Sequence, residues 1–243
     1  SSLDFGSSSL SVANGTLDFT ALSDVTAGAG TLSFTGTGVQ NFKPHAGATH
    51  PAIHKSGSGT LDLTGTSLVC NGFSMRDGTL NLGVCDITTL GDGDFVITGA
   101  TATSIQGLGG RTITVAGDAR LEGHKANRLR LDPLDPWYLN VAGQPDVLYA
   151  VLGNCDASGG SRGRAEECID AGGNNNWDFF NDEWEYFSKV VLNTSATGAG
   201  VSEDVQDFPV LVRLNGDNFN FSQATTGGAD IRFRKSDGTR LSY

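Results

Sequence analysis

A five-residue phrase that recurs along the chain constrains its fold more than any other feature. Gly-Thr-Leu, a polar residue and then Leu or Phe begin at residues 15, 30, 59 and 78, in steps of 15, 29 and 19 residues. Weaker echoes, DFVIT and RTITV, follow downstream. A short strand that recurs with polar inserts of variable length is typical of stacked repeats. The phrase therefore predicts a solenoid of strands.

The composition fits a long, thin core. Gly occurs 34 times in 243 residues, and only 38% of the residues are hydrophobic. A solenoid buries its apolar stripe by stacking each coil on the next, so a modest apolar fraction is enough. The opening residues alternate in the way that strands require, with the pairs Leu3/Phe5, Leu10/Val12 and Leu17/Phe19.

The pattern changes near residue 180. Residues 1–179 are predicted to form the solenoid with irregular rungs, whereas residues 180–243 have longer apolar runs and fewer glycines. A turn signal at Ser236–Thr239 predicts a hairpin. We therefore predict a partial antiparallel β-sandwich in 180–243. Because such a sheet has only four or five strands, we expect it to keep open edges.

The net charge of −11 disfavours binding to nucleic acid, because an acidic surface repels phosphate. The sequence contains no apolar run near the roughly 20 residues that span a bilayer. It also has no signal segment at Ser1, which predicts a mature or internal fragment. An acidic surface suits a secreted protein, and we expect an extracellular or cell-surface location.

The four cysteines form two local pairs, Cys70/Cys85 and Cys155/Cys168. Their separations of 15 and 13 residues are close to the expected length of one coil, which would place the paired sulfurs on adjacent rungs. We therefore predict two disulfides and an oxidising compartment. Buried free thiols are the alternative. Zinc is disfavoured because the chain has no C-x-x-C spacing.

An insertion at residues 39–58 contains three of the four histidines, His45, His50 and His54. Metal binding is one interpretation, but the spacings match no familiar ligand pattern. The favoured interpretation is an enlarged rung whose Phe42 and Ile53 enter the core.

Two downstream features have alternative interpretations. Gly-Asp-Gly-Asp at 91–94 is similar to the turns of calcium-binding repeats, but an ordinary turn is favoured. No metal or other cofactor is therefore predicted, and calcium remains an alternative. Asn174–Asn176 are interpreted equally well as a ladder along the stack or as turn residues. The apolar stretch 127–150, which includes Trp137 and Tyr138, is expected to cover the last rung.

Two resemblances cover most of the chain. Residues 15–179 resemble the right-handed parallel β-helix regions of large bacterial surface and adhesin-like proteins, through the repeated phrase, TITVAGDARL at 112–121 and PWYLNVAG at 136–143. Residues 184–243 resemble the opening half of the DUF2341 domain of large secreted proteins, through Trp184, the FPVLVRL strand and GGADIRFRKSDGTRLSY. Neither resemblance implies a catalytic residue.

The predicted function is a non-enzymatic structural or adhesive surface protein. Its incomplete sheet predicts self-association into a homopolymer, head to tail, by addition of a strand or rung. The residues assigned to that interface are Trp184, Phe208, Ile231, Phe233 and Tyr243.

The alternatives are a carbohydrate-binding module, with aromatic side chains stacking on surface glycans, and a polysaccharide-active enzyme. The enzyme is the less favoured of the two. Carboxylates such as Asp62 and Asp86 occur about once per rung, as on a solvated face, and do not cluster.

Overall fold

The computed structural model describes residues 1–99, 103–180, 190–195, 197–203, 210–228, 231–233 and 241. The chain divides into two compact units, Ser1–Asp182 and Glu183–Tyr243. All assigned strands lie in the first unit, and no α-helix occurs among the described residues. The described residues of the second unit form one short 3-10 helix, Phe221–Gln223, and no strand. The antiparallel sandwich therefore remains a prediction.

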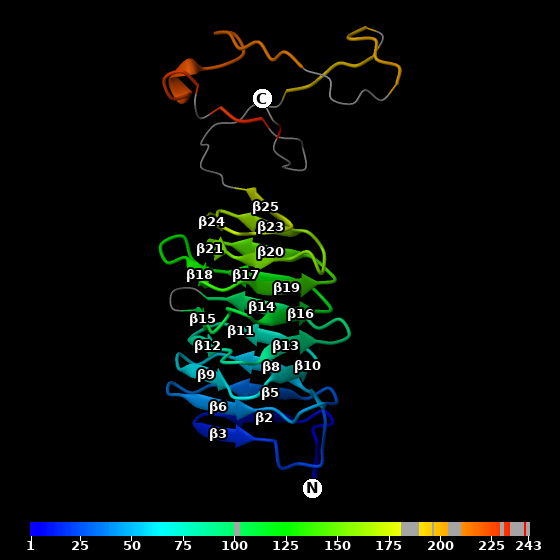
Figure 1. Ribbon diagram of the computed structural model, residues 1–243, viewed down its shortest axis with the longest axis vertical. Helices are drawn as coiled ribbons and strands as arrows, with labels where there is room; N and C mark the ends of the chain where they lie inside the picture. Colours follow the sequence, from blue (N-terminus) through cyan, green and yellow to red (C-terminus); the bar gives the residue numbers. More distant parts are fainter. Residues whose placement is uncertain are drawn as a thin grey trace. The chain divides into compact units, whose positions relative to one another are not determined.

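The first unit is a β-solenoid whose strands stack in parallel columns (Figure 1). The longest column is a nine-stranded sheet in which every neighbour is three strands further along the chain, apart from the last. Its strands are β2 (Ser9–Val12), β5 (Thr31–Phe34), β8 (Ala52–Lys55), β11 (Phe73–Met75), β14 (Phe95–Thr98), β17 (Ala119–Glu122), β20 (Pro145–Leu148), β23 (Gly163–Glu166) and β25 (Trp177–Phe180).

Shorter columns form the other walls. The six-stranded sheet contains β7 (Thr49–His50), β10 (Ser67–Cys70), β13 (Asp86–Thr89), β16 (Thr112–Val115), β19 (Trp137–Val141) and β22 (Cys155–Asp156). The five-stranded sheet contains β3 (Gly15–Asp18), β6 (Gln40–Lys43), β9 (Thr60–Leu63), β12 (Thr79–Asn81) and β15 (Ser104–Gln106). A three-stranded sheet contains β18 (Leu129–Leu131), β21 (Ala150–Gly153) and β24 (Ile169–Gly172), and β1 (Ser2–Asp4) pairs with β4 (Asp24–Thr26).

The repeated phrase marks stacked strands, as predicted. Thr60 pairs with Thr79 and Leu61 with Leu80, so the third and fourth copies lie in register on adjacent coils. The first copy forms β3 in the same sheet, whereas the second forms β5 in the nine-stranded sheet. Only the 19-residue step therefore equals one coil. The prediction of a parallel β-solenoid is confirmed.

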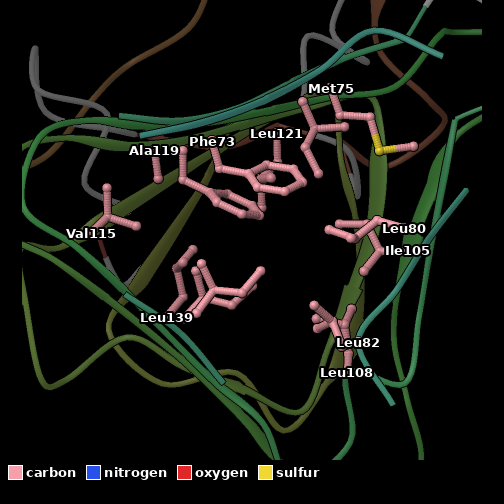
Figure 2. Packing of buried hydrophobic residues seen from close by; sticks show 14 of the residues in the cluster. Phe73, Met75, Leu80, Leu82, Ile105, Leu108, Val115, Ala119, Leu121 and Leu139 are labelled. Atoms are coloured by element: carbon pink, nitrogen blue, oxygen red, sulfur yellow. The ribbon is translucent and has the colours of Figure 1, made fainter. Parts of the chain in front are cut away.

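The core is a continuous column of apolar side chains between the walls. Inward and outward positions alternate along each strand, as in β9, where Leu61 and Leu63 are buried and Thr60 and Asp62 are half-buried. Figure 2 shows side chains from several walls, among them Phe73, Leu80 and Leu139, pointing into the same interior. Each fully buried side chain of this size contributes about 1.5–3 kcal/mol through the hydrophobic effect.

The insertion at 39–58 is an enlarged rung, as favoured, because Phe42 and Ile53 are fully buried. The predicted cap at 127–150 is wrong. Trp137 is fully buried in β19, which lies between β16 and β22, and its indole N–H donates to the Gly153 carbonyl at 3.1 Å. The apolar residues of this stretch belong to ordinary coils, and the stack continues to β25.

Polar side chains at the corners tie each coil to its neighbour. The Asp94 carboxylate accepts a hydrogen bond from the Asp118 backbone N–H at 2.8 Å, and the Asp118 carboxylate accepts one from Gln144 at 2.8 Å. The Gly-Asp-Gly-Asp segment is therefore a turn that bonds along the stack.

The three consecutive asparagines also bond along the stack. Asn174 accepts a hydrogen bond from the Cys155 N–H at 3.1 Å, Asn175 donates to the Asp156 carboxylate at 3.2 Å, and Asn176 donates to the Ala157 carbonyl at 3.0 Å. Their ladder to the coil below therefore exists, although its partners are not other asparagines.

Candidate assembly surfaces

The N-terminal end of the solenoid presents open strand edges. Its first coil consists of β1, β2 and β3, which pair with β4, β5 and β6 respectively. Among the described residues, no strand pairs with the opposite edge of any of these three strands. Such an edge carries backbone N–H and C=O groups that another strand can pair with.

Apolar side chains accompany these edges. Phe5 and Phe19 are buried, and partly buried residues pack against them and the rest of the core. The partly buried residues are Leu3, Val12, Leu17 and Leu22. Leu10 stacks on Leu32 in the register of the nine-stranded sheet, yet it is 38% exposed. The first coil thus has the pattern of an interior coil with one side left uncovered.

Acidic residues border the same end. Asp4 accepts a hydrogen bond from the Gly6 N–H at 2.9 Å, and Asp18 lies 3.3 Å from the Lys43 ammonium. Hydrogen bonds from the Thr20 hydroxyl and backbone N–H lower the pKa of Asp18, with a smaller contribution from Lys43. Asp18 is therefore an anion at neutral pH.

The last coil, at the opposite end, carries aromatic and charged groups. β25 pairs with β23, and no strand among the described residues pairs with its other edge. The Trp177 ring lies so close to Gly163 that a Cβ there would be 2.4 Å from the ring. The Arg164 guanidinium lies 5.0 Å from the centre of the Phe180 ring. Arg162 pairs with Asp178 at 2.5 Å.

A small cavity lies where one wall is interrupted, between the five-stranded and three-stranded sheets. Its volume is about 190 Å³. It is lined by Ile105, Gly107, Leu108, Arg130, Asp132 and Pro133. Typical small-molecule sites have volumes of roughly 300–1,000 Å³. The cavity is therefore small for a substrate, and the strand edges are the more prominent surfaces.

The interface predicted in the second unit is only partly described. Ile231 donates its backbone N–H to the Gly228 carbonyl at 3.0 Å, and the Phe233 carbonyl accepts one from Leu241 at 3.0 Å. Trp184, Phe208 and Tyr243 lie outside the described residues.

Several apolar side chains of the same unit are exposed to solvent. Leu211 is 80% exposed, and Val191 is 73% exposed. No described residue of this unit is buried, so the described part has no core of its own.

The predicted disulfides are absent, because all four cysteines are buried free thiols. One coil is longer than the cysteine spacing, so the paired cysteines fall out of phase. Cys70 pairs with Thr89 of the next coil, whereas Cys85 precedes Asp86, which pairs with Ser67. The three strand positions from Ser67 to Cys70 alone span about 10 Å, beyond the roughly 7 Å that a disulfide bridges between Cα atoms.

The second pair is out of phase for the same reason. Cys155 lies in β22, and its backbone N–H bonds to Asn174 of the next coil. Cys168 lies beside Ala150, whose N–H is 3.4 Å from the sulfur, and precedes β24 in the three-stranded sheet. The two cysteines therefore face different walls. The argument from cysteine to an oxidising compartment no longer holds.

The three clustered histidines do not converge. His50 is fully buried, whereas His54 on the neighbouring strand β8 is exposed, with its Nδ1 2.5 Å from the Ser74 hydroxyl. No group of three His, Cys, Asp or Glu side chains in the described ranges could hold a metal ion.

The aromatic residues considered for glycan stacking are mostly in the core. Trp137 is fully buried and Trp177 is 9% exposed, whereas Tyr138 is 43% exposed on the outer face of β19. Trp184 and Tyr186 lie outside the described residues. Tyr138 is thus the accessible aromatic among the described candidates.

Comparison with known proteins identifies no relative: no family model, no curated protein and no solved structure matches this chain. Within the described part of the chain, no helix is long and apolar enough to cross a membrane.

Proposed function

We propose that this chain is a non-enzymatic structural or adhesive protein of the extracellular space or cell surface, whose copies associate head to tail into a filament. The observation that carries the proposal is the uncovered first coil, in which three strands each pair on one side only. A strand of a second copy that pairs with this edge continues the existing sheets and covers the apolar residues beneath it.

The geometry of such a contact favours a filament over a closed dimer. The N-terminal edge of one copy would join a different surface of the next copy. A contact between two different surfaces repeats without limit unless a rotation closes it into a ring. The donor in this proposal is either the β25 edge or a strand of the second unit that includes Phe208, Ile231 and Phe233.

Two finer features belong to the same proposal. The solenoid is right-handed, because crossovers between parallel strands are right-handed in about 98% of cases. The second unit is a partial antiparallel sandwich of the DUF2341 type, in line with the resemblance of residues 184–243. A sandwich completed by a neighbouring copy also accounts for the exposed Val191 and Leu211.

Electron microscopy and sedimentation velocity test the proposal on the purified chain and on Leu10→Lys. The new ammonium group would lie at the uncovered apolar end, so we expect filaments from the wild type and monomers from the variant. Val84→Lys is the matched control, because Val84 is 61% exposed in a turn far from the first coil. Monomeric wild type at every concentration would refute the proposal, as would filaments from Leu10→Lys.

A further inference from the structure

A buried histidine lies close to the proposed assembly edge. His50 in β7 has no exposed surface. Its ring stacks on Phe19 of the first coil, with centroids 6.0 Å apart and planes 4° apart. It meets Phe42 edge to face at 5.5 Å. The imidazole is therefore part of the apolar packing that joins the first coil to the coils above it.

Both ring nitrogens have defined partners. Nε2 accepts a hydrogen bond from the His45 backbone N–H at 3.1 Å, so it carries a lone pair. Nδ1 lies 2.9 Å from the Val69 carbonyl and must donate to it, since a carbonyl oxygen only accepts. The neutral Nδ1–H tautomer satisfies both bonds. The ring thereby connects the corner after β6 to strand β10.

Protonation removes one of these bonds. An imidazolium carries a proton on each nitrogen, so Nε2 can no longer accept from His45 and two N–H groups then face each other. The cation would also lie in an apolar pocket. The face of Phe19 offers about 0.5–2 kcal/mol of cation–π attraction, but burying a charge without a counter-ion costs more. Burial accordingly lowers the pKa of His50, although its bond to Val69 acts in the opposite direction.

The surrounding charges do not supply a counter-ion. Asp18 and Lys43, at the ends of β3 and β6, pair with each other at 3.3 Å. Asp24 on β4 is exposed. Cys70 pairs with His50 in register, and burial raises the pKa of its thiol to about 12, so it is neutral. The remaining neighbour, His45, lowers the pKa of His50 further.

We propose that His50 is an acid-released latch, which holds the His45 corner and the first coil in place at neutral pH and frees them on acidification. The latch depends only on the solenoid. Its consequence, that acid disrupts the assembly edge, rests on the proposed function.

Hydrogen exchange of residues 44–50 tests the latch on dispersed protein, with rates corrected for intrinsic exchange. In the pH range between the lowered native pKa and the ordinary value of 6.5, protection should fall up to tenfold per pH unit. His50→Gln stays neutral and keeps an acceptor, so its protection should not change over that range. His54→Gln alters an exposed ring and should behave like the wild type.

The proposal is overturned if the wild type and His50→Gln lose protection in parallel. Because His50→Gln could unfold, histidine ring NMR of the wild type provides an independent check. The Nδ1–H tautomer at pH 7 and a loss of corner protection with the same midpoint as ring protonation support the latch. The Nε2–H tautomer, or ring protonation without a change at the corner, refutes it.

The assembly consequence is measured separately, by sedimentation at both pH values. Filaments that persist at acid pH while the corner opens refute the coupling but not the latch. A chain that forms no filaments at any pH refutes the proposed function, and the exchange result still decides the latch.

Discussion

The close approach of successive coils at Gly57 gives a sharp test of the solenoid. Gly57 follows β8 at a corner, where an added Cβ would lie 2.2 Å from the Gly36 carbonyl oxygen and 2.4 Å from that of Thr35. Ordinary contact begins near 3.4 Å, so Gly57→Ala requires the two coils to separate by about 1.2 Å at this point (3.4 minus 2.2).

That separation acts directly on two inter-coil hydrogen bonds. The Ser56 N–H donates to the Phe34 carbonyl at 3.0 Å, and the Gly59 N–H donates to the Gly36 carbonyl at 3.1 Å. Losing both costs about 1–3 kcal/mol, which is also the usual range for an overpacked site. A loss of about 2 kcal/mol lowers the Tm by roughly 4–8 °C in a protein of this size.

Gly38→Ala is the matched control. Gly38 occupies a turn of the neighbouring coil, no atom lies within 4 Å of an added Cβ, and its φ is not positive. We expect this variant to gain roughly 0.4–1 kcal/mol, because alanine restricts the unfolded chain. Urea unfolding of both variants measures the difference. Equal stabilities would refute the close stacking described for these coils.

Three further predictions concern the thiols and the corners. Burial raises the pKa of Cys70 and Cys85 to about 12, so Ellman's reagent should not label them at pH 8 until the protein unfolds; rapid labelling of the native protein would show that they are accessible. Because these native pKa values exceed the ordinary value of 9.0, the stabilisation is complete below pH 9 and is lost as the pH rises towards 12, by up to about 1.4 kcal/mol per pH unit and thiol. Urea unfolding at pH 8 and 10.5 measures this loss, and Cys70→Ala should reduce it; an unchanged loss would contradict the assignment. Asp118→Ala removes the acceptor of the Gln144 N–H and should cost about 1–3 kcal/mol in urea unfolding, whereas Asp118→Asn keeps an acceptor and should cost less; equal losses would mean that this bond is not the cause.

The repeated phrase predicts the solenoid because the side chains within one strand alternate strictly. Leu61 and Leu80 occupy equivalent inward positions, and both can be recognised from the phrase alone. The length of a coil is a different matter, since it depends on corners without periodicity. The register advances by 20 residues from Ile53 to Phe73 but by 26 from Ala119 to Pro145. The predicted disulfides failed because they assumed a coil of about 14 residues.

The surfaces were harder to predict than the core. Nothing in the residue types of β2 distinguishes an uncovered coil from an interior one, because Leu10 and Val12 follow the same alternation as Leu32 and Phe34. The orientation of His50 was equally hidden. It lies in a two-residue strand within an insertion, where no alternating pattern shows which side chain points inward.

The direction of the inter-coil hydrogen bonds determines how the solenoid responds to tension. These bonds, such as that from the Thr64 N–H to the Phe42 carbonyl, join one coil to the next and therefore run along the axis of the stack. A pull on the two ends loads the coils in series, and a coil at one end can peel away while the others keep their bonds. Extension should then proceed in many small steps, each releasing the length of one coil, so that the stack dissipates a mechanical load gradually instead of breaking at once.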